Sequence, residues 1–207
     1  MRSGIGVAQA GIAKGTTEIS ASSTLKERVD TMRSQKGFTL IELLIVVAII
    51  GIIAAIAVPG LLRARMSGNE ASAIGSLRAI NSGEAAFSSS CASGAYATDL
   101  ADMQLKPAGS TQGFVSPDLK SNGVSKSGYL VNLAQDGTSG TQVMSTVTPC
   151  VSGLTGGLAS SYFAESHPVT VGGTGTRSFA SDTRGTLFQD TAGGTAANPI
   201  ALTQTVQ

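Results

Sequence analysis

The stretch that decides the fold runs from Phe38 to Leu62 and reads FTLIELLIVVAIIGIIAAIAVPGLL, with Glu42 as its only charged residue. A helix over this stretch would be about 37 Å long at ~1.5 Å per residue, which exceeds the ~30 Å hydrocarbon core of a bilayer. A charged group within such a span costs roughly 2.5–3.5 kcal/mol, so a carboxylate found there indicates a function. Residues 38–62 are therefore predicted to form a transmembrane helix with one acid near its start.

Two basic residues, Arg33 and Lys36, stand shortly before the apolar run. Basic residues that flank a span stay on the cytoplasmic side, so the rest of the chain is expected to be exported. A conventional secretory signal fits less well, because its apolar region is only about 7–15 residues long and precedes the cleavage site. An ordinary single-span anchor is the simpler alternative, but such an anchor has no use for Glu42.

The segment Lys36–Glu42, KGFTLIE, resembles the class III signal of type IV pilins and pseudopilins. The resemblance implies that a membrane peptidase cuts after Gly37 and methylates the new amino terminus of Phe38. It also implies an assembly ion pair between the amine of Phe38 and the carboxylate of Glu42, to which Thr39 adds a hydrogen bond. Nothing in it implies a cofactor.

The resemblance is close as far as about Ala64 and implies a structural subunit of a type IV pilus. Such a subunit first crosses the bacterial inner membrane once, with its N-terminus in the cytoplasm, and later forms part of a filament on the cell surface. The expected partners are further copies of the chain, a prepilin peptidase and methyltransferase, and the pilus assembly machinery. A pseudopilin of a type II secretion system is the alternative, and a membrane-tethered binding module that never polymerises is a third interpretation.

Residues 1–37 are expected to be a leader that is removed. Met1–Asp30 contains no sustained apolar region, whereas Met32 begins the short leader MRSQKG. Residues 1–31 are therefore interpreted as a wrongly assigned start or an extension, and they are kept out of the fold prediction.

The composition indicates a small exported domain with many loops. The net charge is +1, aromatic residues make up 4% of the chain, and 26 residues are glycine. A chain with so little net charge has no electrostatic footprint for nucleic acid. Cys91 and Cys150 both lie on the exported side, where an even number of cysteines predicts a disulfide. Two buried free thiols are the alternative, and two cysteines provide too few ligands for a metal site.

The helix is expected to continue beyond the membrane as an amphipathic half over residues 63–90. Apolar residues recur every seventh position at Met66, Ala73, Ile80 and Phe87, which predicts one buried face. The charged residues of this half are expected to be exposed or at the edges of that face; they are Glu70, Arg78 and Glu84.

Gly51 and Pro59 interrupt the apolar half of the helix. Proline removes a backbone donor and clashes with the preceding turn, so the sequence itself allows a simple kink here. By resemblance to pilins, the segment between the two residues is a candidate for loss of helical order when subunits pack into a filament.

Residues 91–190 are predicted to form a globular head with an antiparallel sheet, and residues 191–207 a mobile tail. A long helix packed on such a sheet is an α+β fold, as in pilins. The sequence patterns predict a short helix at 99–105 and strands at 129–133, 142–147, 161–165, 177–181 and 186–189. Turn residues predict hairpins between the first two strands and between the last two.

The exported part offers no catalytic constellation. His167 is the only histidine, and a structural role is predicted for it. The glycine-rich segment 171–175 has no lysine to close a phosphate loop, which predicts a turn. Asp182 and Asp190 lack the spacing of a calcium loop. We expect neither enzymatic activity nor a metal site.

Overall fold

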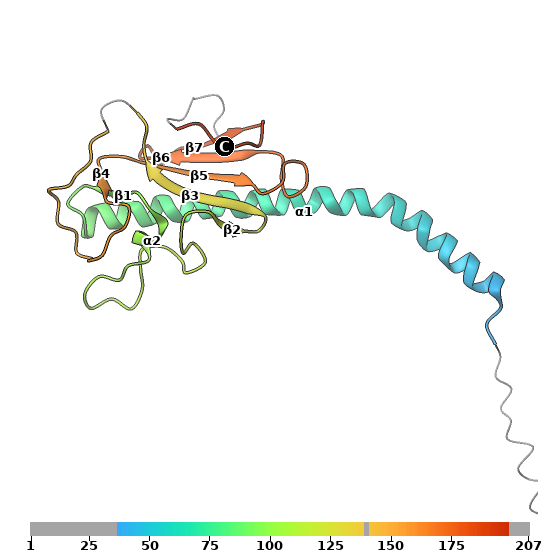
Figure 1. The fold of residues 1–207 in the computed structure, drawn as a ribbon. Coiled ribbons are helices and arrows are strands. Elements are labelled where there is room, and N and C mark those ends of the chain that lie inside the picture. Colours follow the sequence, from blue (N-terminus) through green and yellow to red (C-terminus); the bar gives the residue numbers. More distant parts are fainter. Residues whose placement is uncertain (1–36, 139–140, 199–207) are drawn as a thin grey trace, which may run out of the picture. The chain divides into compact units, whose positions relative to one another are not determined.

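A computed structural model describes residues 37–138 and 141–198 (Figure 1). A long helix and short antiparallel strands make this an α+β protein, as the sequence predicted. The elements, in chain order, are α1 (Leu40–Ser90), β1 (Tyr96–Ala97), α2 (Leu100–Met103), β2 (Val124–Lys126), β3 (Tyr129–Gln135), β4 (Leu158–Ala159), β5 (Tyr162–Pro168), β6 (Ser178–Asp182) and β7 (Leu187–Asp190). The chain divides into two units at Gly51–Ile52, and the second unit contains the head.

The main sheet has five strands in the order β2-β3-β5-β6-β7, and every neighbouring pair is antiparallel. One face of this sheet packs on the second half of α1 (Figure 1). Tyr162 of β5 marks this face, because its hydroxyl donates to Asn81 Oδ1 of α1 at 3.1 Å. A separate pair, β1 and β4, lies beside the end of α1.

The core forms where the apolar stripe of α1 meets the inner face of the sheet. Alternate residues of β3 are buried, as expected for a strand with one covered face. The buried side chains of the stripe are Ala73, Leu77, Ile80 and Phe87. Phe87 also packs edge-to-face on Phe114, with ring centroids 5.1 Å apart. The predicted amphipathic spacing thus identified the face of α1 that is buried.

Two charged residues of α1 do not lie where the sequence placed them. Glu70 and Glu84 are 6% and 0% exposed, so the expectation that both would be exposed or at an edge of the buried face is wrong. Glu70 is bound by Thr176 and Arg177, and Glu84 accepts from Ala97. These contacts come from distant parts of the chain, so they cannot be inferred from helical spacing. Arg78 is exposed, as expected.

The predicted strand 142–147 is also wrong. In this segment only Val143 pairs with another strand residue, through an isolated bridge to Ala159. The prediction depended on the alternation of Val143 and Val147, but Val143 is 66% exposed. Without a face to cover, alternation alone does not hold a strand in a sheet. The predicted hairpin with β3 is therefore absent from the described residues, and β3 instead pairs with β2 and β5.

The described part of the expected tail makes specific hydrogen bonds to the head. The backbone N–H of Ala196 donates to Glu165 Oε2 at 2.9 Å, and Asn198 Nδ2 donates to the carbonyl of Gln135 at 2.8 Å. Residues 199–207 lie outside the described residues, as does the expected leader except for Gly37.

Candidate functional site

Helix α1 begins with a reciprocal capping arrangement. The side chain of Thr39 accepts a hydrogen bond from the backbone N–H of Glu42 at 3.3 Å. In return, Glu42 Oε2 accepts from the backbone N–H of Thr39 at 2.9 Å and from its hydroxyl at 2.6 Å. This is a capping box, in which a threonine and a glutamate three residues later satisfy two free donors at a helix start. The spacing of the two residues could have predicted it from sequence.

Gly37 and Phe38 precede this cap and are exposed. Phe38 is 84% exposed, and no atom lies within 4 Å of the place where a side chain at position 37 would begin. The peptide bond between the two residues is therefore open to another molecule. Among the described residues, nothing packs against position 37 in a way that requires glycine there.

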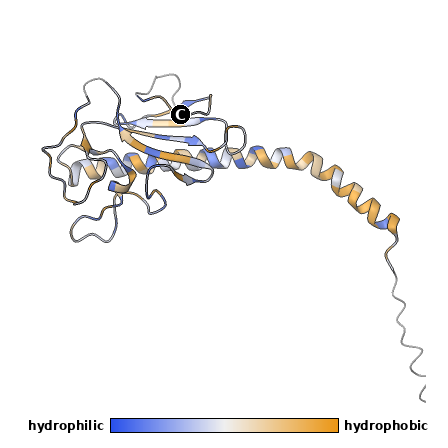
Figure 2. Ribbon diagram, viewed as in Figure 1, coloured by the Kyte–Doolittle hydropathy of each residue, from blue (hydrophilic) through white to orange (hydrophobic). Residues whose placement is uncertain are grey.

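The first half of α1 presents apolar side chains on all sides. From Phe38 to Leu62 the large apolar side chains are between 48% and 84% exposed. Figure 2 shows that most residues along this half of the ribbon have the colour of hydrophobic residues. Among the described residues, α1 is the one helix long and apolar enough to cross a membrane, by length and composition. Such a surface is unfavourable in water and requires lipid or protein around it.

The structure brings Thr39 together with Glu42, but it does not pair Glu42 with Phe38. In the described part of the chain, both hydrogen bonds to the Glu42 carboxylate come from Thr39. Helix α1 is continuous through Gly51 and Pro59. Loss of helical order between these two residues on assembly stays a prediction.

In the head, Glu70 fastens α1 to the connection between β5 and β6. Its carboxylate accepts from Thr176 N and Oγ1, both at 3.1 Å, and from Arg177 Nε and Nη2 at 3.1 and 2.6 Å. Burial opposes ionisation of Glu70, but the hydrogen bonds from Arg177 and Thr176 outweigh it and lower the pKa of this carboxyl. The pair is a structural anchor that sequence reasoning missed.

Glu84 is a second buried acid with quite different surroundings. Its Oε2 accepts from the backbone N–H of Ala97 at 3.1 Å, while its Oε1 is buried without a hydrogen-bond partner. Burial, and secondarily the nearby carboxylate of Asp102, raise the pKa of Glu84 to about 8. The side chain is therefore mostly protonated at neutral pH.

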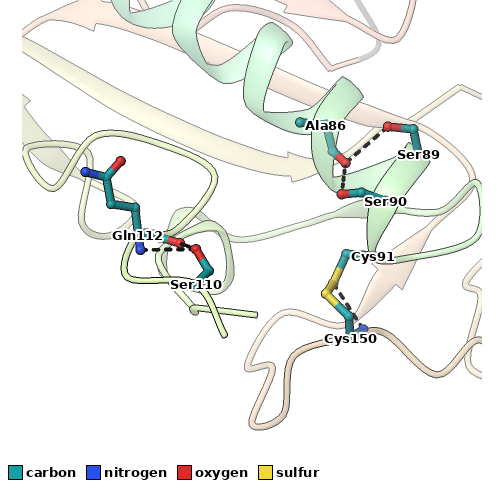
Figure 3. Close-up of a disulfide and its surroundings, with 7 residues drawn as sticks. All are labelled: Ala86, Ser89, Ser90, Cys91, Ser110, Gln112 and Cys150. Carbon is teal, nitrogen blue, oxygen red and sulfur yellow. Dashed lines mark hydrogen bonds between the residues drawn. A yellow bond between two sulfur atoms is a disulfide. The ribbon is translucent and has the colours of Figure 1, made fainter. Parts of the chain in front are cut away.

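A disulfide between Cys91 and Cys150 joins the end of α1 to the long connection between β3 and β4 (Figure 3). The backbone N–H of Cys150 also donates to the carbonyl of Cys91 at 2.9 Å. Just before the bridge, the hydroxyl of Ser90 donates to the carbonyl of Ala86 at 2.6 Å (Figure 3). The structure thus agrees with the predicted pairing of the two cysteines.

Asp102 of α2 holds the far end of the same connection. Its carboxylate accepts from Thr155 N at 2.7 Å, from Thr155 Oγ1 at 2.9 Å and from Gly156 N at 2.9 Å. Asp102 and the disulfide therefore fix a segment that has little regular structure of its own.

No arrangement typical of an enzyme appears in residues 37–138 and 141–198. These residues contain no group of three side chains suited to a metal ion. His167 lies on β5 with its Nδ1 3.5 Å from Glu165 Oε1 and is largely buried. The structural role predicted for this histidine stays a prediction.

Comparison with known proteins concerns the N-terminal segment. The sequence family described as the prokaryotic N-terminal methylation motif matches residues 32–58. The type IV wide pilus major component PilA4 of Thermus thermophilus is 64% identical over 39 residues, which are 19% of this chain and 30% of the relative. A fimbrial protein of Pseudomonas aeruginosa is 82% identical over 28 residues, 14% of this chain and 18% of the relative. A type IV major alpha-pilin of Moraxella bovis is 79% identical over 28 residues, with the same coverage.

The chain thus spans less than a third of the length of these relatives. No solved structure matches it significantly. The motif, the similar pilins and the long apolar helix packed on an antiparallel sheet nevertheless agree with one another. They support the assignment of this chain to the type IV pilin family.

Proposed function

We propose that this chain is a structural subunit of a type IV pilus. It is inserted in the inner membrane as a prepilin, cleaved after Gly37, methylated at Phe38 and polymerised through the first half of α1. The observation that carries the proposal is the exposed, almost entirely apolar segment 38–62. Its one charged residue, Glu42, lies close in sequence to the exposed Gly37–Phe38 bond.

The capping box suggests how Glu42 remains stable before assembly. An unpaired charge in an apolar environment is strongly unfavourable, but this carboxylate already accepts two hydrogen bonds from Thr39. Both bonds fall on Oε2. The carboxylate can therefore accept a further donor without losing its cap.

Cleavage would supply that donor. Before cleavage the nitrogen of Phe38 is an uncharged amide, and afterwards it is an amine that is largely protonated at neutral pH. Phe38 and Glu42 are four residues apart, so they can pair first within one chain. In the filament, Glu42 of an incoming subunit then pairs with the amine of Phe38 in a subunit that is already assembled. This pair fixes the register of the subunits, because an unpaired buried charge is costly. The surrounding apolar side chains supply most of the packing.

The direct test is electron microscopy of sheared surface filaments combined with mass spectrometry of their subunits. Filaments made of this chain, starting at methylated Phe38, are the expected result. A subunit that retains its leader would refute the proposed maturation. A chain that is processed but found only in short periplasmic assemblies that depend on secretion genes would instead indicate a pseudopilin of a type II secretion system.

Two substitutions at Glu42 separate its charge from its cap. Glutamine at this position keeps the capping box, whereas valine removes both the cap and the charge. We expect Glu42→Gln and Glu42→Val both to be cleaved and inserted but to yield few filaments, as counted by microscopy. Normal assembly of Glu42→Gln alone would show that the cap matters and that the ion pair does not.

The cleavage proposal has its own test at Gly37. Because the structure leaves open space at this position, replacement by leucine should not disturb the fold of the chain. We expect Gly37→Leu to accumulate as an unprocessed precursor on immunoblots, since the peptidase would reject the larger side chain. A normal shift to the mature band would contradict the proposed site.

A further inference from the structure

The connection between β5 and β6 exposes two apolar side chains outside the proposed span. Val169 and Val171 are 51% and 56% exposed. Among the described residues after Leu62, one other large apolar side chain is similarly exposed: Val143, at 66%. Single exposed apolar residues are common, but two in one short connection call for an explanation.

Hydrogen bonds fix this connection to α1 at Asn69 and Glu70. Asn69 Nδ2 donates to the carbonyl of Thr174 at 2.8 Å, and Glu70 binds Thr176 and Arg177. The backbone N–H of Val169 also donates to Gly128 in the turn between β2 and β3. The connection is thus fixed to the helix and to the sheet at once.

The anchor point lies close to the end of the apolar run. Asn69 follows Leu62 by about 10 Å along the helix at ~1.5 Å per residue, and both belong to the same compact unit. The headgroup layer on each side of a bilayer is roughly 5–8 Å thick. The helix between the two residues carries Arg63 and Arg65, both exposed. Basic side chains at this level can reach lipid phosphates.

We propose that residues 169–175 rest on the outer surface of the membrane before assembly, with Val169 and Val171 entering the boundary between headgroups and acyl chains. The partner is a phospholipid surface. The inference depends on the proposed function, because it requires residues 38–62 to span the bilayer. That span is longer than the hydrocarbon core, so the helix should tilt in the bilayer.

The chain contains no tryptophan, which allows a direct test in the full-length protein. We would introduce one tryptophan by Val171→Trp, reconstitute the protein in phosphatidylcholine–phosphatidylglycerol vesicles, and compare normal lipids with lipids brominated on their acyl chains. We expect blue-shifted emission and roughly twofold quenching by the brominated lipids, as for a side chain at the interface. Val143→Trp is the matched control, because that exposed valine pairs with β4, beside the end of α1.

A third variant, Ile53→Trp, reports insertion of the span itself and should be strongly quenched. If it is quenched while Val171→Trp behaves like Val143→Trp, the contact with lipid is refuted and the proposed pilus function is unaffected. If Ile53→Trp is not quenched, the span does not insert and both proposals fail. A blue shift at position 171 that ignores bromination but rises with the ratio of protein to lipid would indicate contact between copies of the chain, which also refutes the inference.

Discussion

The buried acid Glu84 should make the head less stable as the pH rises. Its pKa is about 8 in the folded protein, against an ordinary value of 4.5. The folded state therefore binds more protons than the unfolded state between these two values. Under that condition the free energy of unfolding falls with pH, by ~1.4 kcal/mol per pH unit for one group. The loss should begin near pH 4.5 and be complete above about pH 8, for a total of about 5 kcal/mol.

The variant Glu84→Gln removes this titration but keeps an acceptor for the backbone N–H of Ala97. The new amide group has no partner in the core, which should cost about 1–3 kcal/mol at pH 5. The variant should therefore be less stable than the parent at pH 5 and more stable at pH 8, and the two curves should cross between about pH 6 and 7. For a chain of this size the change in midpoint is about 2–4 °C per kcal/mol.

The assay is thermal or urea unfolding of the full chain in detergent, followed by circular dichroism from pH 5 to pH 9. Asp190→Asn is the matched control, because Asp190 is exposed and asparagine can still accept from the backbone N–H of Ala192. Its curve should parallel that of the parent. A difference between Glu84→Gln and the parent that stays constant over this range would refute the account of Glu84.

Two further predictions concern the attachments of the head. Glu70→Gln should cost roughly 1–3 kcal/mol, less than for a fully buried pair because the side chain of Arg177 is 41% exposed. The folded pKa of Glu70 is lowered from its ordinary value of 4.5. Its carboxylate therefore stabilises the fold above pH 4.5, and this contribution is lost as the pH falls through the lowered folded pKa. Unfolding curves of Glu70→Gln should lack that loss. Replacing Cys91 and Cys150 together by serine should cost about 4 kcal/mol, the chain-entropy value for a separation of 59 residues. A reductant should destabilise the parent similarly in urea unfolding and leave the double variant unchanged.

Much of the fold could be predicted because its signals lie in contiguous residues. The strands predicted at 129–133 and 161–165 correspond to β3 and β5, and the Asp182–Gly185 turn predicted the hairpin of β6 and β7. The predicted strand 142–147 failed for a physical reason. Only Val143 of this segment pairs with a strand residue, and its side chain is exposed, so the alternation does not mark a face that the core covers.

The sequence alone determined the long apolar helix at the start of the described chain, because the length and composition of an apolar run need no tertiary partner to identify it. The glycine, the phenylalanine and the glutamate stand within a few residues of one another, so their spacing could be read directly. Only the tertiary structure decided the fate of the two acids in the second half of α1. Glu70 is buried because Thr176, 106 positions away in the chain, arrives with Arg177 to bind it. Glu84 is buried beside Ala97 and Asp102, and receives a single backbone hydrogen bond. Whether an acid is charged depends on which groups come to surround it, and that is a property of the packed chain.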